Sequence, residues 1–252
     1  MGIQIYWPLV LLALACEYVD STLGMGYGTI LTPLLLLMGH GTGQIVPSVL
    51  LSEFMTGILA GIFHHELGNV NLRPGSRPFK VAMVLGACSI VGTLAAVFVA
   101  VNLPAWALKA YIGVLVLAIG IGILVTLRKT FAFSWKKVVG LGLLAAFNKG
   151  ISGGGYGPLV CGGQVLTGVE GREAIGITSL AEGLACLVGV LTYQLTGNGG
   201  VDWTLAPSLA LGAMLSVPLA AITVKKIPMR QMRGAIGVAV TALGLFTLSK
   251  IF

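Results

Sequence analysis

The stretch Gly153-Gly154-Gly155-Tyr156-Gly157 interrupts a long apolar run, and Asn148 and Lys149 stand just before it. Near the start of the chain, Gly24-Met25-Gly26-Tyr27-Gly28 repeats this pattern, with Asp20 before it. Glycine weakens a helix and permits backbone conformations closed to other residues. Within a bilayer such a break is tolerated only where protein or a water-filled cavity satisfies the freed backbone groups. Two breaks at matching positions of two halves predict the substrate site of a transporter.

The composition is that of an integral membrane protein. Of the 252 residues, 56% are hydrophobic and only 9% are charged, and the mean hydropathy is +0.98. A soluble domain carries about 25% charged residues, so this chain has too few to cover a water-facing surface. Its apolar runs are long enough for helices rather than barrel strands. We therefore expect an all-α polytopic membrane protein.

The loop charges predict the orientation. Basic loops stand at 67–80, 128–137 and 224–233, whereas the loops at 102–104 and 196–203 lack Lys and Arg. Short basic loops are typically cytoplasmic, which places both termini outside. The net charge of +7 therefore reflects membrane orientation, and no separate basic domain exists to bind nucleic acid.

The chain is predicted to be two repeats, 1–129 and 130–252, in one membrane domain. The first has apolar runs at 5–22, 27–38, 44–66, 80–101 and 105–127. The second has them at 138–151, 158–168, 174–195, 204–224 and 231–249. The pairs Tyr27/Tyr156 and Glu53/Glu182 keep one offset (156 − 27 and 182 − 53 both give 129), which indicates a tandem duplication. Each repeat has a glycine-broken hairpin and then three full spans. Three crossings are an odd number, so the repeats should be inverted, with their breaks meeting near the bilayer midplane.

The breaks are suited to bind an anion. The helix that follows each break starts at the glycines, so its N–H groups and positive dipole end face the break. Lys149 adds a full charge, and an unpaired lysine in hydrocarbon costs at least about 2.5–3.5 kcal/mol. It should therefore pair with a ligand or a carboxylate, and Asp20, its repeat equivalent, is one candidate. The predicted substrate-binding residues are Gly24, Met25, Gly26, Tyr27, Gly28, Asn148, Lys149, Ser152, Gly153, Gly154, Gly155, Tyr156 and Gly157. The alternatives are close helix packing for the glycines and snorkelling for Lys149.

Three carboxylates are candidates for proton coupling or gating: Asp20, Glu53 and Glu182. Glu53 and Glu182 lie mid-span at equivalent positions, and intramembrane carboxylates are functional candidates by default. The alternative is that each glutamate caps backbone N–H groups of a broken hairpin, and both roles stay open. The four cysteines lack metal-ligand spacing and are interpreted as small buried hydrophobes. The sequence offers no nucleophile–base set, metal motif or cofactor motif, so we expect neither an enzyme nor a cofactor.

The sequence also resembles a known family. The residues Asp20-Ser-Thr-Leu-Gly-Met-Gly-Tyr-Gly-Thr-Ile-Leu-Thr-Pro33, followed by the span that carries Ser52-Glu53, resemble the TauE/SafE sulfite-exporter family. The stretch Lys149-Gly-Ile-Ser-Gly-Gly-Gly-Tyr-Gly-Pro158 is similar to its second half. The resemblance covers essentially the whole chain. It implies a bacterial or archaeal inner-membrane exporter of small sulfur-containing anions, such as sulfite or sulfoacetate-like organosulfonates. The particular anion, the direction, the coupling ion (protons are a candidate) and a homodimeric state stay open.

An ion-selective channel is the alternative function. Gly26-Tyr27-Gly28 and Gly155-Tyr156-Gly157 are similar to the Gly-Tyr-Gly of potassium-channel filters. In those filters the motif follows a pore helix, whereas here it opens a helix and presents the positive end. The Thr-Val that precedes the filter motif is also missing here. Saturable flux would indicate a carrier, and ohmic single-channel current would indicate a pore.

Overall fold

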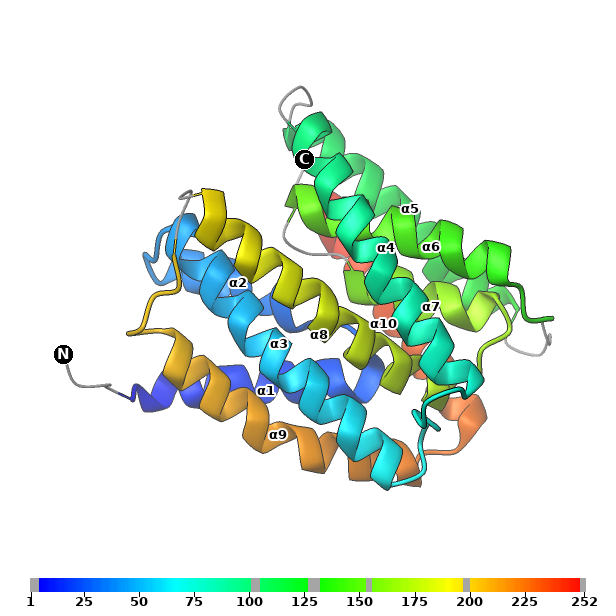
Figure 1. The fold of residues 1–252 in the computed structure, drawn as a ribbon. Coiled ribbons are helices and arrows are strands. Elements are labelled where there is room, and N and C mark those ends of the chain that lie inside the picture. Colours follow the sequence, from blue (N-terminus) through cyan, green and yellow to red (C-terminus); the bar gives the residue numbers. More distant parts are fainter. Residues whose placement is uncertain (1–4, 101–104, 127–131, 153–155, 197–199, 250–252) are drawn as a thin grey trace.

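The computed structural model describes residues 5–100, 105–126, 132–152, 156–196 and 200–249 (Figure 1). All regular structure in these ranges is helical, which confirms the predicted all-α class. The ten described helices are α1 (Trp7–Leu23), α2 (Tyr27–Leu37), α3 (Thr42–Glu66), α4 (Arg77–Ala100), α5 (Ala105–Val125), α6 (Trp135–Ser152), α7 (Tyr156–Leu166), α8 (Gly171–Thr196), α9 (Ala206–Lys226) and α10 (Met229–Ser249).

The helix ends lie within three residues of the predicted apolar runs, and the differences have a common cause. The runs were predicted to begin at 80, 138 and 174, whereas α4, α6 and α8 begin three residues earlier, at Arg77, Trp135 and Gly171. Hydropathy marks only the part of a helix that lies in hydrocarbon. The first turn of each helix carries charged residues and belongs to the bilayer interface, where such residues reach water.

The helices fall into two length classes. α2 and α7 have 11 residues each, about 16 Å of helix, which is roughly half of the hydrocarbon thickness. Among the described residues, three stretches are long and apolar enough to cross a bilayer: Gln44–Glu66 in α3, Gly171–Leu195 in α8 and Ala206–Lys226 in α9. These spans are consistent with a multi-pass membrane protein.

The long helices pack in pairs. α1 lies along α9, α4 along α6, α3 along α8, and α5 along α10 (Figure 1). Glycine permits the close approach at the α3–α8 crossing, since a Cβ at Gly57 would lie 2.6 Å from the Ser179 carbonyl oxygen. At the α5–α10 crossing a Cβ at Gly244 would lie 2.6 Å from the Leu117 backbone nitrogen. Small residues at crossings are the usual means of helix association in membranes.

Basic loops gather at one end of this bundle. Arg77 forms an ion pair with Glu173 near the start of α8 (3.6 Å), and its guanidinium lies 5.1 Å from the Phe133 ring, just before α6. Asn69, just after α3, donates a hydrogen bond to the Ala221 carbonyl near the end of α9 (2.8 Å). The ends of α3 and α9 and the starts of α4, α6 and α8 therefore lie together.

At the opposite end of the bundle, the starts of three helices lie together. The Tyr6 backbone N–H, just before α1, donates to the Ser208 hydroxyl near the start of α9 (2.9 Å). The Asp202 backbone N–H donates to the Ser48 hydroxyl near the start of α3 (2.9 Å). α1, α3 and α9 therefore all begin at this end, away from the basic loops.

Candidate functional site

The two glycine breaks contact each other inside the bundle. α1 ends at Gly24, and both Gly24 (φ +73°) and Gly26 (φ +131°) adopt backbone conformations that L side chains rarely take. The chain turns there and continues into α2. Gly157, in the first turn of α7, packs onto this turn: a Cβ on it would lie 2.7 Å from the Gly24 carbonyl oxygen and 2.9 Å from Met25 Cα. Glycine at 157 therefore lets the start of α7 touch the first break.

Carboxylates of the protein itself occupy the start of α2. The Tyr27 N–H donates to Asp20 Oδ1 (3.0 Å), and the Gly28 N–H donates to Glu53 Oε1 (3.1 Å). The Tyr27 hydroxyl, fully buried, shares a hydrogen bond with Ser52 (2.8 Å). A helix start favours negative charge because its first N–H groups have no partner within the helix. The start of α2 is thus capped by two carboxyl groups of the protein itself.

The second break carries a buried ammonium group. Lys149 Nζ lies 2.7 Å from Glu182 Oε1 and 3.3 Å from Glu53 Oε2, and the side chain is only 8% exposed. It also lies 5.6 Å from the centre of the Tyr156 ring, within the range of a cation–π contact. The Tyr156 hydroxyl accepts a hydrogen bond from Ser89 (3.4 Å). Lys149 therefore joins α6 to both α3 and α8.

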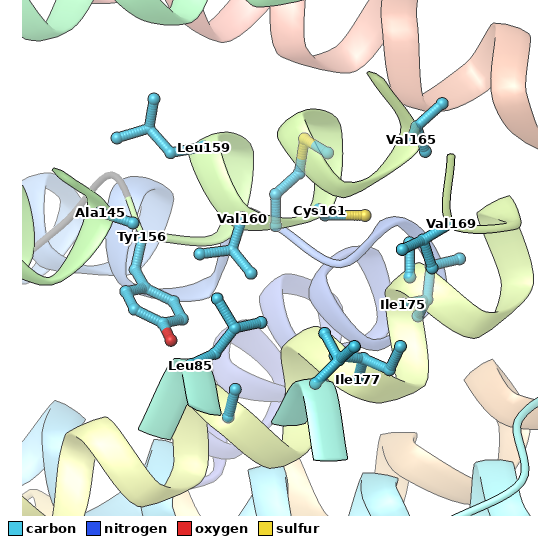
Figure 2. Packing of buried hydrophobic residues seen from close by; sticks show 14 of the residues in the cluster. Leu85, Ala145, Tyr156, Leu159, Val160, Cys161, Val165, Val169, Ile175 and Ile177 are labelled. Atoms are coloured by element: carbon cyan, nitrogen blue, oxygen red, sulfur yellow. The ribbon is translucent and has the colours of Figure 1, made fainter. Parts of the chain in front are cut away.

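Tyr156 lies at the edge of a buried apolar cluster and carries a polar hydroxyl there. Figure 2 shows its side chain next to Leu85 of α4 and Val160 of α7, and all three belong to one buried core. Further along α7, the Cys161 thiol donates to the Leu23 carbonyl at the end of α1 (3.3 Å). These contacts hold α7 in place, so that its start faces Lys149 on one side and the first break on the other.

A small acidic cavity lies beside this site. Four carboxylates line it: Glu17, Asp20, Glu53 and Glu182. They are half of the eight Asp and Glu residues in the chain. The free space is about 10 Å³, close to the minimum for one water molecule. Four carboxyl groups therefore surround a space without room for a larger ligand, and two of them contact the Lys149 ammonium.

Comparisons with known proteins show the family of this chain. The family model described as "Sulfite exporter TauE/SafE" matches residues 9–247. The chain belongs to the TauE/SafE family. It is also 28% identical over 228 residues to "Probable membrane transporter protein YtnM" of Bacillus subtilis (strain 168), and this match covers 85% of the chain and 73% of that protein. No solved structure matches. The family and this relative point to a membrane transporter rather than to an enzyme.

The structure of this TauE/SafE member brings together most of the predicted site residues. Met25, Tyr27, Tyr156 and Asn148 are buried, and Gly157 contacts the first break. Gly153, Gly154 and Gly155 lie outside the described residues, as does the side chain of Ser152.

The structure bears on two expectations about individual contacts. Lys149 pairs with Glu53 and Glu182 where Asp20 was the candidate partner, because Asp20 is engaged by the start of α2. Glu53 caps a backbone N–H of the broken hairpin, at Gly28. Both glutamates contact Lys149.

Several residues of the site were not predicted. Glu17, Thr56 and Ser179 line the cavity, and the Cys186 thiol donates to Glu53 Oε2 (3.2 Å), which is more than the apolar role expected for the cysteines. Each stands three or four positions from a predicted carboxylate on the same helix, for example Cys186 from Glu182. Residues at this spacing share a helix face, and that signal would have found them.

Proposed function

We propose that this protein is a secondary transporter that exports small sulfur-containing anions, such as sulfite or sulfoacetate-like organosulfonates, across the inner membrane of a bacterial or archaeal cell. The anion binds near the bilayer midplane, where the two glycine breaks meet. The two repeats, 1–129 and 130–252, form the two sides of the site. Exchange of access between the two faces then requires one repeat to move against the other.

The helix directions support an inverted arrangement. α3 ends at the basic end of the bundle, whereas α8, its repeat equivalent, begins there next to Arg77. α9 ends near Asn69 at the basic end, whereas its equivalent α4 begins there. By the positive-inside rule this end is cytoplasmic. Both termini are then outside, because α1 begins and α10 ends at the opposite side.

The observation that carries the proposal is the position of Lys149. Its ammonium is buried where the start of α7 meets the first break, and its partners come from α3 and α8. A buried charge of this kind in a membrane protein is costly and marks a substrate or ion pathway. An anion can take the place of one carboxylate, because a sulfonate or sulfite oxygen accepts the same ammonium N–H groups.

The conformation described is a closed one. A free volume of about 10 Å³ holds about one water molecule, and a sulfur oxyanion is several times larger. Binding therefore requires the contact between Gly157 and the Gly24–Met25 turn to open. Both segments begin or end short helices, which can shift without unfolding a full span.

A ligand screen on purified protein tests the proposal. Sulfite, thiosulfate, sulfate, sulfoacetate and taurine are compared by the rise in unfolding temperature, since a ligand stabilises according to its concentration over its Kd. We expect one or more sulfur anions to stabilise the protein. Lys149→Met should then weaken binding at least tenfold, because a charge-assisted hydrogen bond contributes about 1.5–3 kcal/mol. Lys136→Met, at the exposed start of the same helix, is the matched control.

The variant needs a safeguard, because Lys149→Met leaves two carboxylates without their partner. The triple variant Lys149→Met, Glu53→Gln, Glu182→Gln removes the uncompensated charge and should fold as the wild type does. If the folded triple variant binds the screened anions with wild-type affinity, the site lies elsewhere. Anion flux into proteoliposomes that saturates with concentration would support a carrier, and ohmic single-channel current would support the channel alternative.

A further inference from the structure

The Lys149 ammonium is held from two sides by carboxylates on different helices. Glu182 comes from α8 and Glu53 from α3, and both oxygens lie within ion-pair distance of Nζ. Glu53 is fixed further by the Gly28 N–H and the Cys186 thiol. An incoming anion therefore meets a lysine that already has two counter-charges. The anion can form an ion pair with the Lys149 ammonium only if Glu53 or Glu182 releases it.

The surroundings of Lys149, Glu53 and Glu182 hold more carboxyl groups than cationic groups. The titratable groups near Glu53 and Glu182 on the packed elements are Glu17 and Asp20 of α1, Tyr27 of α2, Lys149 of α6, Tyr156 and Cys161 of α7 and Cys186 of α8. Lys149 is the one group among them that can carry a positive charge. Like charges that share a buried site resist ionising together, so a further anion is opposed unless positive charge enters with it.

The net charge of Lys149, Glu53 and Glu182 together indicates how many protons must enter with the anion. Lys149 with two ionised carboxylates has a net charge of minus one. A monovalent anion that arrives with one proton leaves that net charge unchanged, because the proton neutralises the carboxylate that the anion displaces. A divalent anion with two protons, one on Glu53 and one on Glu182, gives the same result. The two carboxylates thus offer one proton site per negative charge, up to two.

We propose that Glu53 and Glu182 are proton-binding sites that release Lys149 to the anion, so that protons and anion bind together and cross the membrane in the same direction, one proton per negative charge. This inference rests on the proposed transport function. Each proton comes from water and returns to water on the other side, and no covalent bond to the anion forms. Transport is then electroneutral, and the carrier exports when the outward anion gradient exceeds the opposing pH gradient.

Proton uptake on binding is the direct measurement. Calorimetric titration of the whole protein in two buffers of different ionisation enthalpy gives the number of protons taken up. Methanesulfonate (monovalent) and sulfoacetate (divalent) are the probes, because their charge stays fixed near neutral pH, whereas sulfite itself titrates there. We expect about one proton with methanesulfonate and about two with sulfoacetate. By linkage, affinity for methanesulfonate should rise up to tenfold for each unit that the pH falls.

Variants locate the proton sites. Glu53→Gln and Glu182→Gln should each reduce the proton uptake with sulfoacetate by about one. Each glutamine keeps the shape and hydrogen-bonding ability of the side chain but cannot titrate. Glu66→Gln, at the exposed end of the same helix as Glu53, is the matched control and should leave the uptake unchanged.

The outcomes separate the two proposals. If either probe binds without proton uptake, or if sodium replaces the protons, the coupling is wrong while anion transport stands. Uptake that persists in the double variant Glu53→Gln, Glu182→Gln would place the proton sites elsewhere and would also overturn the inference. If neither these probes nor the other sulfur anions bind at any pH, the proposed function itself is wrong and the coupling falls with it.

Discussion

The two glycine breaks share a sequence pattern but differ in the sign of one charge. Asp20 precedes the first break and accepts the N–H that opens α2. At the equivalent position of the second break stands Lys149, which reaches away to Glu53 and Glu182. A short helix of 11 residues follows each stretch of glycines in the sequence, α2 after the first and α7 after the second. The comparison teaches that two similar glycine patterns can carry opposite charges, and under the proposed function the break with Lys149 is the one that needs an external anion.

The largest expected effect comes from removing the two charges in turn. Lys149→Met leaves two buried carboxylates without a partner, so we expect the free energy of unfolding to fall by about 3–5 kcal/mol at neutral pH. Asp20→Asn keeps a hydrogen-bond acceptor for the Tyr27 N–H and removes one charge from an acidic cavity. It should change the free energy of unfolding by less than about 1 kcal/mol. Equilibrium unfolding in detergent measures both, and equal losses would contradict the difference between the breaks.

A second comparison concerns the glycines at the two helix starts. At Gly157 a Cβ would lie 2.7 Å from the Gly24 carbonyl oxygen, which is backbone. At Gly28 it would lie 3.0 Å from Glu53 Oε1, the end of a flexible side chain. We expect Gly157→Ala to lower the free energy of unfolding by about 1–3 kcal/mol and Gly28→Ala by less. Thermal unfolding of the two variants measures this order.

The control for this pair is Gly140 of α6, where a Cβ would meet nothing within 4 Å. Gly140→Ala should raise the free energy of unfolding by about 0.5–1 kcal/mol, because alanine is the better helix former. If Gly157→Ala were as well tolerated as Gly140→Ala, the two breaks would not be in contact.

The sequence was sufficient for the helices and for some of the residues that line the cavity, and insufficient for the contacts among them. Hydropathy located each apolar run because burial in lipid requires it, and the repeat offset identified Glu53 and Glu182 as equivalent. That offset pairs equivalent positions of the two halves, such as Asp20 and Lys149, but it does not predict which residues are in contact. Lys149 instead touches Glu53 from the other half. Which residues meet between halves depends on how the helices cross, and the sequence periodicity does not contain that information.

The smallest expected effect tests whether the first break is closed by a hydrogen bond or by charge. Asp20 Oδ1 accepts the Tyr27 N–H at 3.0 Å, as a capping residue does at a helix start. Asp20→Ala removes the acceptor, and loss of such a cap costs typically about 1 kcal/mol. Asp20→Asn keeps it, so its free energy of unfolding should exceed that of the alanine variant. If the two variants were equally destabilised, charge alone would close the first break. Asp20 would then differ from Lys149 only in the sign of its charge, and its hydrogen bond to the Tyr27 N–H would not contribute to stability.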